Sequence, residues 1–210
     1  MRENRFYENG IMRTAFLLSD ILFISLLYLL VSLPVITLGA STAALHHTVR
    51  KLLARQEGTP WREFLESFWR NLPGATALGA FGTLFLGFLV FDCILIFPLI
   101  YSLGGFYWVL GGLLAIGGIL GAMWLQLWLP CFVRYPDRVK PVMINCFWIT
   151  AENPGRCLVL LLLRLLGVAI GLFFFHLIWP VALLLPAAWA MLLSPLQDRL
   201  FQKYAKEPPV

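Results

Sequence analysis

Residues 14–33 read TAFLLSDILFISLLYLLVSL, and Pro34 follows directly. A helix of 20 mostly apolar residues rises about 30 Å, which matches the hydrocarbon thickness of a bilayer. Pro34 lacks a backbone N–H and disfavours helical geometry at the residue before it, so the helix is expected to end here. The stretch is longer than the apolar core of a signal peptide, about 7–15 residues. We interpret it as a retained transmembrane helix.

The whole chain has the composition of a membrane protein. Of its 210 residues, 60% are hydrophobic and 13% are charged, and the mean hydropathy is +0.81. A soluble domain of this length would carry far more charge on its surface. We therefore expect an all-α polytopic membrane protein, a helical bundle that forms a single integral membrane domain over residues 1–210. The predicted spans cover residues 14–33, 35–55, 74–97, 106–133, 155–175 and 178–200.

The number of crossings depends on the segment at 35–55. It contains His46, His47, Arg50 and Lys51, and it is expected to be short or to cross only partly. If this segment returns across the bilayer, the chain crosses about six times. If it stays at the surface, the chain crosses five times and the N-terminus lies outside. The distribution of basic residues favours six crossings.

Basic residues lie near one end of nearly every apolar stretch. Of the 16 Lys and Arg residues, 15 lie at the N-terminus, at 50–70, at 134–156 or in the C-terminal tail. Cytoplasmic loops of membrane proteins collect Lys and Arg. We therefore predict a multi-pass protein of the plasma membrane with both termini in the cytoplasm. Because the cations flank apolar spans, the expected partner is the lipid bilayer and not nucleic acid.

Two amphipathic helices are predicted on the cytoplasmic side, at 58–72 and at 137–153. Each precedes an apolar span, and this similarity suggests a weak internal repeat. In the first helix, apolar residues recur at helical spacing, and the helix is expected to lie along the interface or against a partner. The residues on this face are Trp61, Phe64, Leu65, Phe68 and Trp69.

Arg164 is the one basic residue inside an apolar run. It follows Gly155 by nine residues, a depth of roughly 13 Å. Asp20 follows Arg13 by seven residues, a depth of roughly 10 Å. An unpaired charge in the membrane is costly, so Asp20 and Arg164 are a candidate intramembrane pair. The pair could be structural or bind substrate; alternatively, Arg164 could extend to the headgroups.

The helix break after residue 33 is a second candidate site. Broken helices in transporters bind substrates at their polar ends, whereas a simple hairpin turn is capped by its own hydroxyls. Asp92, near the outer end of a span, could bind a sugar hydroxyl or a cation, or reach interfacial water. The break residues are Pro34, Thr37, Gly39, Ser41 and Thr42.

Small residues recur every four positions in two spans, and such stripes let helices pack closely in membranes. Homo-oligomers could form through them. The first stripe is Ala75, Gly79, Thr83 and Gly87, and the second is Gly167 and Gly171.

The motifs of enzymes with known chemistry are absent from the sequence. It contains no H-E-x-x-H, no G-x-S-x-G, no phosphate-binding loop and no G-x-G-x-x-G. Adjacent His46 and His47 point about 100° apart on a helix, and no third metal ligand is evident. We therefore predict no catalytic, cofactor-binding or metal-binding residues, and a protein that is not an enzyme.

One stretch is specific enough to suggest a family. Residues 32–45 read SLPVITLGASTAAL, and Phe64, Phe68 and Asn71 follow at fixed spacing. This pattern resembles the YesL family, bacterial integral membrane proteins with a domain of unknown function.

The resemblance implies a small polytopic protein of Gram-positive bacteria with an accessory role in carbohydrate uptake. The expected function is a non-enzymatic accessory subunit of a membrane transport complex, associated with the permease subunits of a sugar ABC importer. The alternative is a small stand-alone transporter or channel that uses the break at 33–42 with Asp20, Asp92 and Arg164.

Overall fold

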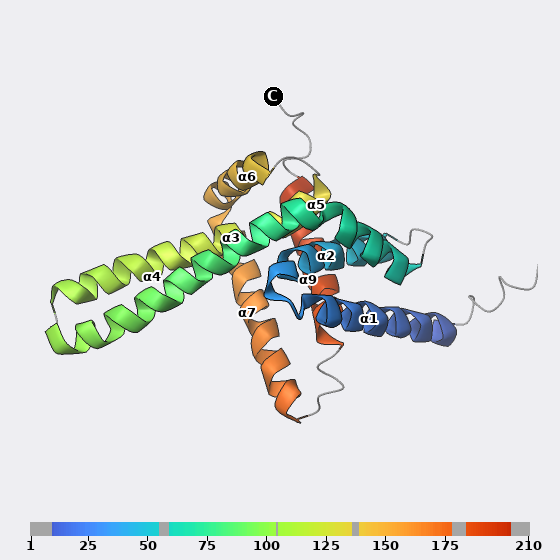
Figure 1. Cartoon of the computed structure of the whole chain (residues 1–210), viewed down its shortest axis with the longest axis horizontal. Coiled ribbons are helices and arrows are strands. Elements are labelled where there is room, and N and C mark those ends of the chain that lie inside the picture. Colours follow the sequence, from blue (N-terminus) through green and yellow to red (C-terminus); the bar gives the residue numbers. More distant parts are fainter. Residues whose placement is uncertain (1–9, 55–58, 104, 136–138, 178–183, 203–210) are drawn as a thin grey trace, which may run out of the picture.

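The computed structural model describes residues 10–54, 59–103, 105–135, 139–177 and 184–202. All regular structure in these ranges is helical, which confirms the predicted all-α class. The elements, shown in Figure 1, are α1 (Gly10–Ser32), the 3₁₀ turn η2 (Val35–Thr37), α2 (Leu38–Leu53), α3 (Pro60–Leu103), α4 (Phe106–Leu125), α5 (Trp128–Arg134), α6 (Val139–Glu152), α7 (Pro154–Leu177) and α9 (Leu185–Gln202).

Three helical stretches are long and apolar enough to cross a membrane: Pro60–Ile96, Phe106–Arg134 and Pro154–Phe175. The first helix adds a shorter apolar stretch at Leu17–Ser32. These segments identify a membrane protein. The α2 helix has 16 residues, so it is roughly 24 Å long and cannot cross a ~30 Å core by itself. The choice between five and six crossings stays a prediction.

The prediction of separate helices at 58–72 and 74–97 is wrong, because α3 runs unbroken from Pro60 to Leu103. Pro73 and Pro98 both lie inside it. A proline costs the helix one backbone hydrogen bond, but membrane helices tolerate it. The amphipathic segment is therefore the first part of a helix that continues into the span. The chain reverses direction at Gly105, whose φ of 45° suits glycine.

The predicted span at 106–133 is divided by a turn at Gln126 and Leu127, between α4 and α5. The Gln126 side chain lies in this turn and donates from Nε2 to the Cys157 carbonyl at 2.7 Å. In contrast to Pro73, Pro154 does begin a new helix, α7. The last predicted span, 178–200, contains α9, which begins at Leu185; its first residues, 178–183, lie outside the described part of the chain.

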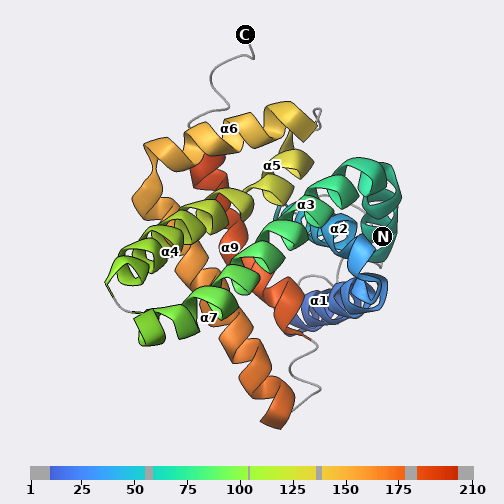
Figure 2. The same ribbon diagram turned by 60° about the vertical axis from the view of Figure 1, so that its left-hand side comes forward.

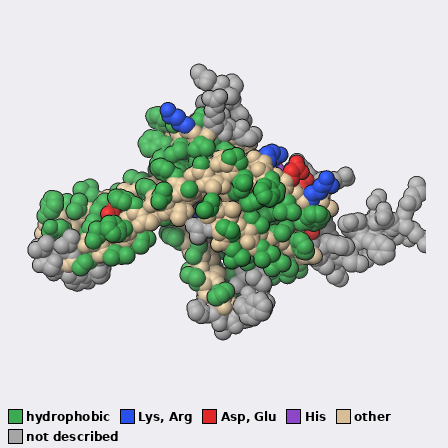
Figure 3. Space-filling model, viewed as in Figure 1, with side chains coloured by type: hydrophobic (Ala, Val, Ile, Leu, Met, Phe, Trp, Pro, Cys, Tyr) green, Lys and Arg blue, Asp and Glu red, His purple; other side chains and the backbone are tan. Residues whose placement is uncertain are grey.

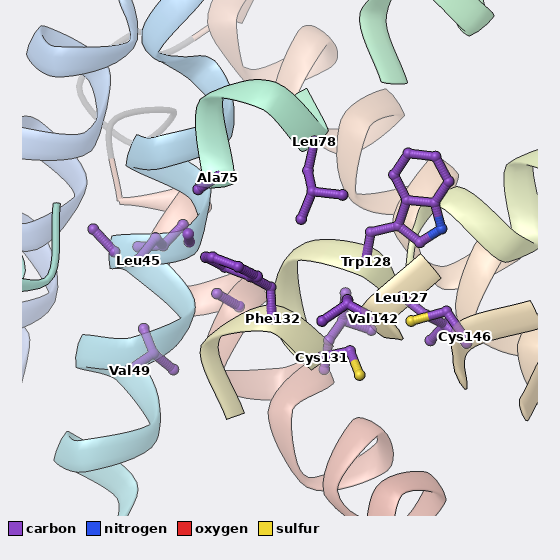
Figure 4. Packing of buried hydrophobic residues seen from close by; sticks show 14 of the residues in the cluster. Leu45, Val49, Ala75, Leu78, Leu127, Trp128, Cys131, Phe132, Val142 and Cys146 are labelled. Carbon is purple, nitrogen blue, oxygen red and sulfur yellow. The ribbon is translucent and has the colours of Figure 1, made fainter. Parts of the chain in front are cut away.

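The buried core surrounds α2. This helix packs against α1, α3, α5 and α9, and its small residues Ala40, Ala43 and Ala44 are fully buried. Large side chains from three other helices fill the adjacent space. Figure 4 shows the part of the core formed by Leu45, Val49, Ala75, Leu78, Leu127, Trp128, Cys131, Phe132, Val142 and Cys146.

Long helices project from this core. The second half of α3 and the α4 helix form an antiparallel hairpin, and α7 and α1 extend in other directions (Figures 1 and 2). On the face seen in Figure 3, hydrophobic side chains cover the hairpin, while Lys and Arg lie elsewhere. The described protein therefore combines a packed core with apolar arms that have few neighbours in the chain.

Candidate functional site

The hydroxyls of the helix break bind the chain's own backbone. The Thr37 hydroxyl lies 2.6 and 2.8 Å from two carbonyl oxygens of the preceding turn. Thr42 and Ser41 donate to the Leu38 carbonyl at 2.7 and 3.1 Å. Both residues lie inside α2 and therefore do not cap it. These bonds engage the hydroxyls with the chain's own carbonyls, which supports a plain hairpin turn rather than a turn whose hydroxyls are free for a substrate.

Gly39 has a packing role in this turn. A Cβ atom there would lie 2.8 Å from the Gly79 Cα, and a Cβ at Gly79 would lie 2.6 Å from the Gly39 Cα. The α2 and α3 backbones are thus in direct contact, and only glycine fits on both sides. Pro34 follows the end of α1, and the contact between Gly39 and Gly79 then determines where α2 lies on α3.

Arg164 lines a cavity of about 460 Å³ between α1, α2, α7 and α9. Apart from Arg164, its polar lining comes from Tyr28, Thr42, His46 and the Trp189 indole, and the other walls are mainly apolar. We call this the Arg164 pocket. Of the residues singled out in the sequence as polar site candidates, the structure brings Thr42 and Arg164 together here.

Asp20 and Arg164 do not form the predicted ion pair. The ion pairs within the described ranges join Lys51 to Glu63 and Arg134 to Asp198. Equal depth was a poor guide because α1 packs mainly on α2, α9 and α3. Tyr28, two turns after Asp20 on α1, is the residue that lines the pocket with Arg164.

The electrostatics of the Arg164 pocket are dominated by a single positive charge. Arg164 is the charged residue among those that line the pocket, and His46 lies beside it. The Thr42 hydroxyl and the Trp189 indole already donate to backbone carbonyls, at 2.7 and 3.2 Å. The pocket can accordingly offer an anion the guanidinium, together with the polar groups of Tyr28 and His46.

Asp92 lies in the part of α3 that belongs to the projecting hairpin (Figure 1). It does not line the Arg164 pocket, and it takes part in neither of the ion pairs in the described ranges. The structure therefore separates Asp92 from the other polar candidates. Its role as an outer polar site stays a prediction.

The apolar face predicted for 58–72 is divided between the core and the surface. Phe64 and Phe68 are buried, Leu65 is half-buried, and Trp61 and Trp69 are 48% and 68% exposed. Phe64 and Phe68 thus anchor the start of α3 on the protein's own core. Trp61 and Trp69 are the members of this face that remain available to lipid or to a partner.

Part of each small-residue stripe is occupied within the chain. Gly79 contacts Gly39, Ala75 is fully buried, and Gly167 lies directly against the Trp189 indole. By contrast, a Cβ at Gly87 would meet no atom within 4 Å. Oligomerisation through the first stripe would have to use its outer end, and the second stripe is largely covered at Gly167.

The residues that sequence reasoning missed are Tyr28, His46 and Trp189. Tyr28 lies in an apolar run and Trp189 follows a proline-rich stretch, so neither carried a distinctive pattern. His46 was considered only as a metal ligand. Among the described residues, no group of three His, Cys, Asp or Glu side chains could hold a metal ion.

Comparison with known proteins identifies one family match. The family described as "Protein of unknown function, DUF624" matches residues 18–93, which include most of α1, the break, α2 and much of α3. No curated protein matches the chain. No solved structure matches it either. The match covers the segment that suggested the YesL family, and YesL-like proteins belong to the matched family.

Proposed function

We propose that this protein is a non-enzymatic accessory subunit of a membrane transport complex. The observation that supports this most directly is the exposure of its apolar helices. In an apolar 18-residue window of α3, 0% of the residues are buried, and the buried share is 6% in the corresponding 18-residue windows within Phe106–Arg134 and within Pro154–Phe175. These helices therefore have surface left for the spans of another membrane protein.

The outer part of α3 offers a surface for such contacts. Gly87 continues the stripe of Gly79 and Thr83 beyond the contact with α2, and space around it is open. On α4, Gly112 and Gly117 are open in the same way. Lipid chains do not require small residues, whereas a second helix packs closely on them. A partner span on this hairpin would explain both features.

The identity of the partner rests on the resemblance to the YesL family, which implies a sugar importer. We propose that the hairpin packs on the permease subunits of a carbohydrate ABC importer in the plasma membrane. The basic residues favour cytoplasmic termini.

Co-purification tests this proposal. The tagged protein is solubilised in a mild detergent and the proteins recovered with it are identified and quantified. Permease subunits in stoichiometric amounts are expected, and Gly87→Leu should reduce their recovery severalfold. Gly155→Leu is the matched control, because a Cβ at Gly155 also meets open space but lies outside the hairpin. A protein that purifies without permease subunits and transports a solute in liposomes would refute the accessory role.

The Arg164 pocket favours a second candidate, a small stand-alone transporter. The pocket combines one cation with an apolar wall and includes Thr42 from the helix break. This alternative predicts that purified protein in liposomes takes up an anionic solute and that Arg164→Gln abolishes the uptake. If Arg164→Gln takes up the solute as fast as the parent protein, Arg164 does not take part in transport.

A further inference from the structure

We propose that a second cavity, of about 460 Å³ on the basic side of the molecule, binds the phosphate group of an anionic phospholipid. The inference is independent of the proposed transport role. We call this cavity the basic pocket, and it is defined by His47, Arg50, Lys51, Ala54, Arg70, Asn71, Val133 and Arg134.

The basic pocket is created by tertiary structure. Arg50 and Lys51 come from the last turn of α2, Arg70 comes from α3, and Arg134 ends α5. Packing thus brings together cations from three helices that are up to about 80 residues apart in the chain. The lining contains no carboxylate. Four like charges at one cavity repel one another, and a bound anion would relieve this repulsion.

Two of the four cations already have partners. Lys51 pairs with Glu63, and Arg134 pairs with Asp198. In the described part of the chain, Arg50 and Arg70 make no ion pair. The lining therefore keeps two uncompensated guanidinium groups, one on each of two packed helices. Guanidinium groups match the geometry of phosphate oxygens and can bind them through two parallel hydrogen bonds.

His47 reports the positive potential of the basic pocket. Burial lowers its pKa first, and the charges of Arg70 and Lys51 lower it further, whereas Glu63 acts in the opposite direction and Arg50 adds a smaller decrease. The inner wall contains Asn71, which is 8% exposed and donates from Nδ2 to the Ser67 hydroxyl at 3.2 Å. The hydrogen bond to Ser67 thus fixes Asn71 in the pocket wall before any ligand binds.

The position along α3 favours a lipid over a soluble phosphate. Trp69, next to Arg70, is 68% exposed, and Trp61 on the same helix is 48% exposed. Exposed tryptophans collect at the level of the lipid headgroups. The helix then continues into its apolar span, so its first part lies where headgroups are found. Basic pockets between helices on the cytoplasmic side are suited to anionic headgroups.

Native mass spectrometry of the full-length protein in neutral detergent tests the proposal. Phosphatidylglycerol and phosphatidylcholine are titrated separately, and bound lipid is counted. We expect preferential binding of phosphatidylglycerol. Arg50→Gln/Arg70→Gln should weaken it at least about tenfold, since each lost contact is a charge-assisted hydrogen bond. The matched control is Arg62→Gln/Arg156→Gln, which removes two exposed cations outside the basic pocket and should change binding less than about twofold.

Competition separates the two sources of phosphate. If the headgroup within the bilayer is the ligand, millimolar inorganic phosphate or glycerol 3-phosphate should not displace phosphatidylglycerol. If these soluble phosphates do displace phosphatidylglycerol, and the Arg50→Gln/Arg70→Gln variant no longer responds to them, the basic pocket is a phosphate site whose ligand is a soluble phosphate ester. Equal loss in the pocket and control variants, or no preference for phosphatidylglycerol, would overturn the proposal. The single variant Arg50→Gln changes an exposed side chain and gives an intermediate loss if the double variant does not fold.

Discussion

Replacing Gly39 by Ala should force α2 away from α3. The new Cβ would overlap the Ala75 carbonyl oxygen, and it would lie 2.8 Å from the Gly79 Cα and 3.0 Å from the Ala75 carbonyl carbon. Carbon atoms prefer separations of about 3.5–4.0 Å, so the two helices must separate by roughly 1 Å. Backbone atoms cannot rotate out of the way as a side chain can. The strain must therefore be absorbed by the packing of α2.

The expected cost follows from this geometry. Overpacking a well-packed interior costs about 1–3 kcal/mol, and a contact with backbone on both sides belongs at the upper end. For a chain of 210 residues, each kcal/mol corresponds to about 2–4 °C in Tm. We therefore expect Gly39→Ala to lower the Tm by about 6–12 °C.

The assay is thermal unfolding of the full-length protein in detergent, followed by tryptophan fluorescence and by the fraction that remains monodisperse. Gly87→Ala is the control on the same face of α3, because its Cβ would meet no atom within 4 Å. Its Tm should equal or exceed that of the parent, since alanine favours helix more than glycine. Gly79→Ala should resemble Gly39→Ala, and the double variant should lose less than the sum of the two. If Gly39→Ala is as stable as Gly87→Ala, the backbone contact between α2 and α3 is wrong.

Two further predictions concern polar groups. Ser25 is fully buried and accepts the Ala187 N–H of α9 at 3.1 Å, so Ser25→Ala should lower the free energy of unfolding by about 1–3 kcal/mol, as measured by thermal unfolding. The control Ser32→Ala loses only a bond within its own turn and should lower it less. Equal losses in the two variants would contradict the bridge from Ser25 to α9. Arg164→Met should raise the Tm, because an unpaired charge in apolar surroundings is removed; a lower Tm would indicate a stabilising contact of Arg164.

Local sequence was sufficient to predict α1. The apolar length and Pro34 predict a helix at 14–33, and the structure has Gly10–Ser32. Local sequence could not distinguish the two later junctions that contain a proline, at Pro73 and at Pro154. Leu72-Pro73 continues a helix while Asn153-Pro154 separates two. Burial of the flanking residues does not separate the two junctions either, because Phe68 and Ala75 around Pro73 are buried and so are Ile149 and Cys157 around Pro154.

The candidate site shows the same division. A lone arginine in an apolar run was a clear signal, and Arg164 does line a cavity. The neighbours of Arg164 were not predictable from sequence. Two residues at equal depth in the membrane are close together only when their helices run alongside each other. The structure packs α1 on α2 and α9 and brings Tyr28 and His46 to Arg164 instead of Asp20. The basic pocket was equally hidden, since its cations come from separate helices.

Sequence alone determined that this is a helical membrane protein, which segments are apolar, and where the cations concentrate. Those properties depend on composition and on short-range periodicity, which the chain carries regardless of its fold. The tertiary structure decided which small residues are used internally, which polar groups meet in the Arg164 pocket, and which cations form the basic pocket. These features depend on contacts between distant segments, such as Gly39 against Gly79, where a close fit of backbones determines everything that packs around it.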